Sequence, residues 1–374
     1  MDSSEIIDKQ FAIKILERSL KLYTPSLREK PLAEFIAEQC YDLGFEDIRI
    51  DDVGNVIARK GNGSPRILLC GHMDTVPVEI KVMKEGDSLF GRGSSDAKSS
   101  LIAMLLATSL IKEDVGTITF VGAVDEEGNA TGIKNIMKQK HDFDYAVFGE
   151  PSGLKQITIA YKGRLAINLR INVKSSAHAS APWLSKNAIE EAIMISSTIK
   201  KALESDQRDQ KKSMIITASI TEIKGGSSHN VTPKECHVTL DIRIPVSTDC
   251  KSIEEKLARL ISNISNTKDI EIFYSILDET EPFETSHNSS LIRAFTLGIL
   301  DVERTLPTLI RKTGTGDMNI VGNQMKIPII SYGPGDPHES HTLNEKVSIN
   351  EYLRGIEILQ RSLVHLKRLH SKRK

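Results

Sequence analysis

Five polar clusters in this chain each follow a short apolar run and carry His, Asp or Glu side chains that could bind metal ions or transfer protons. The clusters are Gly71-His72-Met73-Asp74, the segment 91–98 with Asp96, Asp125-Glu126-Glu127, Gly149-Glu150-Pro151, and the segment 333–345 with His341. His72 and Asp74 are two residues apart, so they face one side of an extended chain. A metal-bound imidazole needs a carboxylate on its second nitrogen, which Asp74 can supply. In the acidic triplet, one carboxylate can bind metal while its neighbour acts as a base.

Two other interpretations of these clusters fail on their residue patterns. Gly91 and Gly93 do not begin a G-x-G-x-x-G phosphate loop, because Asp96 stands where the third glycine belongs. His338-Glu339-Ser340-His341 is not H-E-x-x-H, and the glycines and prolines around it exclude the helix that a zincin motif requires. Taken singly, each cluster is also compatible with a solvated polar turn. Because all five close a predicted strand, we favour one shared site.

The apolar pattern of the chain predicts the elements that position these clusters. Strand-like runs at 55–59, 66–70, 117–124 and 145–148, with an apolar helix at 99–111, predict an α/β fold with a mixed sheet covered by helices. The middle of the chain predicts strand 165–173, helix 187–203, strands 215–223 and 235–244, helix 252–264 and strand 270–276. That β-α-β-β-α-β order is the ferredoxin-like pattern. We therefore predict an α+β domain inserted at 164–280 into a catalytic domain formed by 1–163 and 281–374.

Composition excludes several classes of partner. The 374 residues carry 49 Lys and Arg against 50 Asp and Glu, a net charge of −1, which gives no bias toward nucleic acid or anionic membranes. No apolar run reaches the about 18 residues that span a bilayer. The polar start 1–5 is unlike a signal peptide, and the four cysteines are widely spaced without a C-x-x-C motif, so we expect a cytoplasmic protein. The basic end, 367–374, is interpreted as a solvated helix end that frays.

The five clusters, in this order and rough spacing, resemble the M20 metallohydrolases. That family includes acetylornithine deacetylase, succinyl-diaminopimelate desuccinylase and carboxypeptidases of the glutamate type. The resemblance covers nearly the whole chain and implies a zinc exopeptidase-like catalytic domain, with the inserted domain serving as lid and homodimer interface. It also implies two Zn²⁺ ions, with Co²⁺ as the alternative. The ligands would be Asp96 bridging both ions, His72 and Glu150 on one, and Glu127 and His341 on the other. Asp74 would orient His72, and Glu126 would be the general base.

The resemblance also implies residues that hold the substrate. His178 matches the lid histidine that reaches the substrate oxyanion, often from the partner subunit, while Asn230 and Arg243 match lid segments that hold the substrate. Gly314 and Asp317 lie in the substrate loop 312–319. Together with Ala97-Lys98-Ser99-Ser100, this loop resembles the branch that frees lysine or ornithine from the γ-carboxyl of a glutamate ending a small acidic amino-group carrier protein. Basic residues that could meet that carrier are Lys162, Arg164, Lys200, Lys201, Lys211 and Lys212.

Other functions stay open at this point. Within the enzyme class, the alternatives are an N-acetylornithine deacetylase, a succinyl-diaminopimelate desuccinylase or a dipeptidase, which differ in the acyl group accepted. A zinc-retaining protein without catalysis is a remote alternative, because such a protein is expected to lack the base or a ligand, and all are present here. A serine hydrolase is disfavoured because the chain has no G-x-S-x-G motif.

Overall fold

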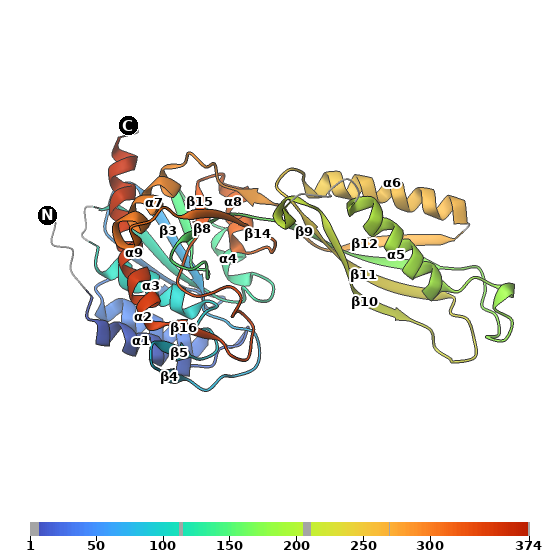
Figure 1. The fold of residues 1–374 in the computed structure, drawn as a ribbon, viewed down its shortest axis with the longest axis horizontal. Coiled ribbons are helices and arrows are strands. Elements are labelled where there is room, and N and C mark those ends of the chain that lie inside the picture. Colours follow the sequence, from blue (N-terminus) through green and yellow to red (C-terminus); the bar gives the residue numbers. More distant parts are fainter. Residues whose placement is uncertain (1–6, 112–114, 205–210, 269, 373–374) are drawn as a thin grey trace. The chain divides into compact units, whose positions relative to one another are not determined.

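The computed structural model describes residues 7–111, 115–204, 211–268 and 270–372, which form two compact units (Figure 1). Unit 1 comprises Met1–Ile159, Thr285–Ile310 and Gly316–Lys374, and unit 2 comprises Ala160–Glu284 and Arg311–Thr315. The predicted boundaries, 163/164 and 280/281, lie a few residues from these.

One part of the predicted boundary is wrong. The segment Arg311–Thr315 was expected in the catalytic domain with the rest of 281–374, but it belongs to unit 2. Within unit 2, Arg311 bonds the Glu284 carboxylate, and the Thr315 hydroxyl accepts a hydrogen bond from Arg243.

Unit 1 is built on a mixed sheet with helices packed against it. Its helices are α1 (Lys9–Lys21), α2 (Lys30–Asp42), α3 (Lys98–Ser109), α4 (Thr131–Ile136), α7 (Ser290–Glu303), α8 (Asp317–Met325) and α9 (Ile349–Ser371). The sheet strands are β1 (Glu46–Ile50), β2 (Val56–Lys60), β3 (Arg66–His72), β6 (Thr117–Ala123), β7 (Tyr145–Phe148), β8 (Gln156–Tyr161) and β15 (Ile329–Ser331), in the order β1-β2-β6-β3-β7-β15-β8. The short strands β13 (Phe283–Glu284) and β14 (Thr308–Lys312) both pair with β8.

Four central strands of this sheet run in one direction. Strand β3 pairs in parallel with β6 and with β7, and β7 pairs in parallel with β15. Their carboxyl ends therefore meet at one edge, where open α/β sheets bind ligands. The core of β3 is fully apolar and buried, because helix α3 covers it. Polar residues that follow these strands are thus brought together at the edge.

Helix α3 is the central helix of unit 1. Every residue from Lys98 to Thr108 is buried, because α3 lies against β3 and β6 and is covered in turn by α1 and α9. A helix with an apolar residue on every side is stable only when it is enclosed in this way. Helix α3 begins at Lys98, two residues after Asp96. The packing of α3 therefore helps to fix the position of Asp96.

The carboxyl end of the chain is more ordered than its basic composition predicts. Helix α9 continues to Ser371, and the expectation of a fraying end from residue 367 is wrong for the described part of that segment. His370 bonds the Ser64 hydroxyl through Nε2 at 2.7 Å and the Tyr145 hydroxyl through Nδ1 at 3.2 Å. Lys367 donates from Nζ to the Ser64 carbonyl at 2.6 Å. The last two residues, 373–374, lie outside the described residues.

A three-stranded sheet in unit 1 joins distant parts of the chain. Its strands are β4 (Met83–Glu85), β5 (Ser88–Phe90) and β16 (Lys346–Ser348), in the order β16-β5-β4. Strands β5 and β16 are antiparallel, with Lys346 opposite Phe90. This pairing puts the residue before β16, Glu345, beside the loop that follows β5.

Unit 2 is an antiparallel sheet with helices α5 and α6 packed against it. Its main elements are β9 (Gly163–Asn172), α5 (Ala188–Glu204), β10 (Thr217–Gly225), β11 (Glu235–Ile244), α6 (Cys250–Lys268) and β12 (Glu271–Thr280), with the short helices η2 (Pro182–Leu184) and η3 (Lys212–Met214). The sheet order is β10-β11-β9-β12. Along strand β9, buried Leu165, Ile167 and Leu169 alternate with residues that are mostly polar and more exposed. The buried side chains form the face of the sheet against which α5 and α6 pack.

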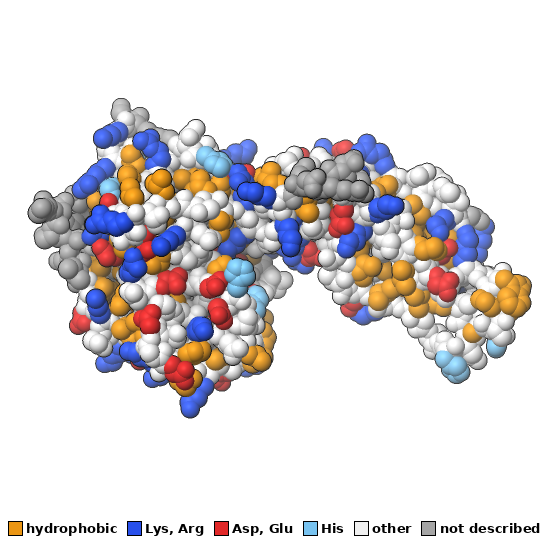
Figure 2. Space-filling view, viewed as in Figure 1, with side chains coloured by type: hydrophobic (Ala, Val, Ile, Leu, Met, Phe, Trp, Pro, Cys, Tyr) orange, Lys and Arg blue, Asp and Glu red, His pale blue; other side chains and the backbone are white. Residues whose placement is uncertain are grey.

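The surface carries charges of both signs. Figure 2 shows Lys and Arg side chains interspersed with Asp and Glu on the face in view, in agreement with the net charge of −1. Such mixing produces no extended field of one sign on that face. Among the described residues, no helix combines the length and apolar character needed to cross a membrane.

Candidate active site

The predicted metal-binding residues of unit 1 meet at the carboxyl edge of its sheet. His72 is the last residue of β3, Glu126 and Glu127 follow β6, and Glu150 follows β7. Asp96 lies between β5 and α3, and His341 lies in the loop between β15 and β16. The parallel strands thus supply most of the cluster, and two long connections supply the rest.

Asp96 stands between the two histidines. Its Oδ1 lies 3.3 Å from Nε2 of His72, and its Oδ2 lies 3.6 Å from Nε2 of His341. On the far side, His341 Nε2 is 2.8 Å from Oε1 of Glu127, and His72 Nε2 is 3.9 Å from Oε1 of Glu150. One carboxylate therefore faces two imidazoles, and each imidazole has a further carboxylate beside it.

This donor set fits a pair of metal ions. Ligand atoms of His72, Asp96 and Glu127 all lie within 4.8 Å of one another. Imidazole nitrogen and carboxylate oxygen are ligands that zinc uses in proteins. Because the two oxygens of Asp96 point to different histidines, Asp96 is suited to bridge two ions, with His72 and Glu150 on one side and Glu127 and His341 on the other.

The tautomer of His72 also suits metal binding. Its Nδ1 is 2.9 Å from the backbone carbonyl oxygen of Asp74, and a carbonyl only accepts, so Nδ1 carries the proton. Nε2, which faces Asp96, is then the ring nitrogen that would bind a metal ion. The Asp74 carboxylate, expected to orient this ring, is 3.5 Å from Nδ1, so the Asp74 carbonyl makes the shorter contact. Burial lowers the pKa of His72, but the hydrogen bonds with Asp74 and Asp96 outweigh burial and raise this pKa well above its usual value.

The Asp74 carboxylate has a second set of partners that the sequence does not reveal. It is fully buried and accepts hydrogen bonds from the backbone N–H of Glu126 at 3.1 Å and of Glu127 at 3.0 Å. The Ser26 hydroxyl donates to it at 2.7 Å. Asp74 therefore fixes the backbone that carries the predicted base and one predicted ligand.

The three acids after β6 have separate environments. Burial, with the Glu150 carboxylate nearby, raises the pKa of Glu126 well above its usual value, so this side chain holds a proton readily. The hydrogen bond with Glu127 raises the pKa of His341. Asp125 has a positive φ of 59°, accepts a bond from the Thr131 hydroxyl and is not part of the cluster.

Asp317, predicted in the substrate loop, occupies a buried position at the start of α8. Its residue is 6% exposed, and its Oδ1 has no hydrogen-bond partner among the described residues. Burial, opposed by the charge of His72 and supported by that of Glu150, raises the pKa of Asp317 to about 7. Asp317 therefore adds a buried acid whose charge interacts with the charges of His72 and Glu150.

The predicted substrate residues of unit 2 lie in two paired loops and on one strand. His178 forms an isolated antiparallel β-bridge with Val231, and the Ala179 N–H donates a hydrogen bond to the Asn230 carbonyl at 2.8 Å. Arg243, on β11, donates from Nε to the Asp241 carboxylate at 2.6 Å. Gly314 lies in the short segment of unit 2 described above. Their roles in substrate binding stay predictions.

The basic residues suggested for carrier binding divide into two groups. Lys162 is 2% exposed, and Arg164 binds the carboxylates of Asp241 and Asp278 at 2.7 and 2.9 Å, so neither is an open surface cation. The other four are exposed lysines and remain candidates for carrier binding. These are Lys200, Lys201, Lys211 and Lys212.

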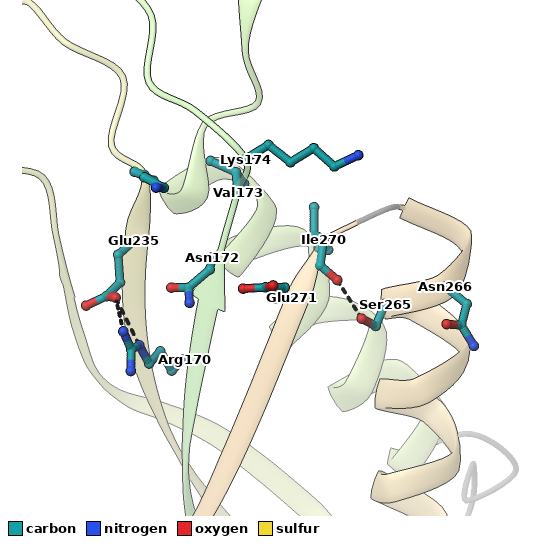
Figure 3. A pocket seen from close by; sticks show the side chains of 10 residues that line it. Arg170, Asn172, Val173, Lys174, Glu235, Ser265, Asn266, Ile270 and Glu271 are labelled. Carbon is teal, nitrogen blue, oxygen red and sulfur yellow. Dashed lines mark hydrogen bonds and ion pairs between the residues drawn. The ribbon is translucent and has the colours of Figure 1, made fainter.

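A separate pocket in unit 2 does not carry comparable chemistry. It lies between β9, β11, β12 and the end of α6, and its walls include Arg170, Glu235, Asn172 and Glu271 (Figure 3). Arg170 is already paired with Glu235 at 2.7 Å, and both side chains are about half exposed or nearly so, at 50% and 43%. An exposed pair of opposite charges has little affinity left for a ligand.

Two imidazoles on either side of one carboxylate, beside a buried glutamate able to take a proton, fit a metal-dependent hydrolase. The sequence profile of peptidase family M20/M25/M40 matches residues 68–365. The chain therefore belongs to this peptidase family and is a hydrolase of amide bonds.

Curated relatives resemble the chain over nearly its full length. The LysW-lysine/LysW-ornithine hydrolase of Sulfurisphaera tokodaii is 33% identical over 90% of both chains. The enzyme of the same name from Saccharolobus solfataricus is 32% identical over 93% of this chain and 94% of its own.

Solved structures share the fold. Aminopeptidase PepT from Bacillus cereus has a TM-score of 0.81 at 20% identity, covering 97% of this chain and 100% of its own. A dinuclear metal-binding M20 peptidase from Bacillus subtilis has a TM-score of 0.74 at 14% identity, covering 95% and 97%. The predicted α/β fold class is confirmed by these likenesses, and metal binding by a dinuclear centre is typical of the family.

Proposed function

We propose that this protein releases lysine or ornithine from the γ-carboxyl of a glutamate that ends a small acidic amino-group carrier protein, as a step of lysine and arginine biosynthesis. The observation that carries the proposal is the likeness to two LysW-lysine/LysW-ornithine hydrolases at 32–33% identity over at least 90% of each chain. The cluster around Asp96 supports the amide-hydrolysis chemistry that such a reaction needs.

We further propose that the metal centre holds two Zn²⁺ ions, with Co²⁺ as the alternative. Nitrogen and oxygen donors suit zinc, and cobalt binds similar sets. Bound ions would polarise the amide carbonyl and stabilise the negative charge that develops on its oxygen. Their identity is decided by the metal content of protein purified without added metal and by activity after each ion is restored.

Glu126 moves the protons of this reaction. It takes a proton from the attacking water as the water oxygen bonds to the carbonyl carbon. When the C–N bond breaks, Glu126 gives that proton to the leaving amine of lysine or ornithine. Burial raises the pKa of Glu126, so the side chain holds the proton between the two steps. Asp74 keeps Glu126 in place through the backbone N–H of that residue.

Unit 2 would complete the substrate site. We propose that it acts as a lid and joins two copies into a homodimer, with His178 donating to the substrate oxyanion in the partner's site. Arg243 and Asn230 would hold the substrate carboxylate. The guanidinium of Arg243 can do so through two parallel hydrogen bonds. Strand β10, at the edge of the unit 2 sheet, has exposed Ile220 and Ile223 at 45% each, which supports a partner at this edge.

The four cysteines are buried and unpaired, which fits a protein of the reducing cytoplasm.

Charge should guide the carrier to the enzyme. An acidic carrier is attracted by exposed lysines, and such attraction weakens as salt shortens the screening length. We expect kcat/KM for the carrier substrate to fall steeply with salt, and Lys200→Glu with Lys201→Glu to reduce it further. Turnover of a small acyl substrate should change little in either case. Carrier turnover that is independent of salt would contradict this part of the proposal.

The proposal as a whole is tested with a panel of substrates. Metal-loaded protein is incubated with lysine-bearing carrier, N-acetylornithine and N-succinyl-diaminopimelate, and amine release is followed, with Glu126→Gln as control. We expect release from the carrier alone and none from the variant. Fast release from a small acyl substrate, without release from the carrier, would replace the substrate and keep the mechanism. No release from any substrate by protein with two bound ions would contradict the proposal.

A further inference from the structure

Glu345 makes an unusual set of contacts behind the metal-binding cluster. It is 0% exposed, and its Oε1 accepts hydrogen bonds from the backbone N–H of Gly93 at 3.0 Å, Ser95 at 2.9 Å and Asp96 at 2.9 Å. Its Oε2 accepts from Nη1 of Arg92 at 2.7 Å. A buried carboxylate is costly unless donors surround it, and here four donors offset that cost.

These contacts hold the loop between β5 and α3. The segment between β5 and α3 is a run of turns, and its residues from Gly91 to Ser95 are buried. Three of its backbone N–H groups, those of Gly93, Ser95 and Asp96, donate to the Glu345 carboxylate, and loss of that acceptor from a buried loop would be costly. The pairing of β5 with β16 brings Glu345 to this loop, and the Gly91 N–H also donates to the Glu345 carbonyl at 3.2 Å.

The loop ends in Asp96, whose position is fixed from both sides. On the amino side, Glu345 holds the Asp96 N–H. On the carboxyl side, the fully buried Lys98 donates from Nζ to the Leu22 carbonyl at 2.6 Å and to the Ser19 carbonyl at 3.3 Å. These bonds tie the start of α3 to the end of α1. Loss of the Glu345 carboxylate would remove the acceptor of the Asp96 N–H and of two more backbone N–H groups in the same loop.

We propose that Glu345 is a positioning residue that sets the affinity of the metal centre, because it holds the Asp96 carboxylate between His72 and His341. This inference rests on the proposed two-metal centre. The geometry gives Glu345 control over both halves of the site. Asp96 faces both histidines, and His341 is only four residues before Glu345 in the same segment. A shift of this segment therefore moves one ligand directly and a second through the loop.

Glu345→Gln is the informative substitution. The amide oxygen of Gln can still accept from the loop, but its NH₂ group then faces the Arg92 guanidinium, which only donates. If the amide turns around, NH₂ faces the three backbone N–H groups instead. Both orientations oppose donor to donor, so the loop must move. We expect Co²⁺ to bind about 10–100-fold more weakly, as when residues that orient ligands are replaced.

The experiment titrates Co²⁺ into metal-free protein and follows both the heat of binding and the visible spectrum of bound cobalt. The matched control is Glu303→Gln. Glu303 is another enclosed carboxylate of unit 1, with a side chain 3% exposed, and it pairs with Arg354 at 2.6 Å and Lys155 at 3.7 Å. We expect weaker binding and a changed cobalt spectrum for Glu345→Gln only.

Further results distinguish a failure of the Glu345 positioning role from a failure of the two-metal centre. If Glu345→Gln is too unstable to study, Arg92→Gln keeps the three backbone bonds and should weaken Co²⁺ binding in the same direction, to a smaller extent. Wild-type binding and spectrum in both variants, or the same change in Glu303→Gln, would overturn the positioning role. Failure of the wild-type protein to bind two ions would instead overturn the metal centre itself.

Discussion

Replacement of Asp74 by asparagine should damage the site through the backbone rather than through a lost ligand. The Oδ1 atom accepts from the Glu126 N–H at 3.1 Å, and Oδ2 accepts from the Glu127 N–H at 3.0 Å and the Ser26 hydroxyl at 2.7 Å. An asparagine side chain has one acceptor oxygen and one NH₂ donor. In either orientation, one of the two backbone N–H groups faces a donor and loses its partner.

The magnitude follows from that count. Leaving one buried donor unpaired costs about 1–3 kcal/mol, and Ser26 can turn to accept from the new NH₂ group. We therefore expect the free energy of unfolding to fall by about 1–3 kcal/mol. Because Glu126 and Glu127 move with their backbone, kcat/KM should fall about 10–100-fold, as it does when groups that orient a metal site are altered.

The assay combines urea unfolding with steady-state kinetics of metal-loaded protein. Asp144→Asn is the control, because Asp144 also accepts a backbone bond, from the Arg66 N–H at 2.7 Å, at the opposite end of β3 from His72. The control can keep its single backbone bond through the asparagine oxygen, so it should change little in stability and keep wild-type kinetics. If Asp74→Asn loses stability but keeps kcat/KM within about twofold of wild type, the positioning role of Asp74 is refuted.

Three further predictions follow from the same contacts. Glu126→Gln should lower kcat by about 10²–10⁴-fold with unchanged metal content, and should stabilise metal-free protein above neutral pH in urea unfolding, because burial raises the pKa of Glu126 and the neutral amide avoids that cost. In metal-free protein, burial raises the pKa of Asp317 from 3.8 to about 7, so the folded state binds its proton more tightly than the unfolded state. That stabilisation is complete below about pH 4 and is lost as the pH rises through about 7; the Tm of chelated protein should fall across this range, and Asp317→Asn should remove the fall. Gly298→Ala, between α7 and α9, would put a methyl group 2.2 Å from Oγ of Ser362 and 3.0 Å from the Ile358 carbonyl oxygen. We expect a loss of about 1–3 kcal/mol in urea unfolding, partly restored by adding Ser362→Ala, with kcat/KM unchanged.

The sequence predicts most of what positions the cluster. The apolar runs before His72 and Glu126 are long enough to be buried strands, and the structure places them at β3 and β6 with ends within two residues of those predicted. Parallel strands bring their ends together, so clusters far apart in the chain are expected at one edge. The motif spacing then identifies the family, which the profile match confirms.

The hydrogen bonds that hold the cluster could not be predicted in the same way. The Glu126 N–H bonds Asp74 across 52 residues of chain, and the Asp96 N–H bonds Glu345 across 249 residues. Such contacts have no local periodicity or spacing, because they depend on how separate elements pack. The placement of segment 311–315 in unit 2 likewise depends on contacts with residues far away in the chain, such as that of Thr315 with Arg243.

The central claim is that a two-metal centre shared through Asp96 cleaves the amide of carrier-bound lysine. The most direct measurement adds Zn²⁺ stepwise to chelated protein and follows, by intact mass, the loss of lysine from the carrier. We expect no loss without metal, full turnover once two ions are bound per chain, and none with Glu126→Gln at any metal level. Lysine release by metal-free protein, or two bound ions with no release, would contradict the account.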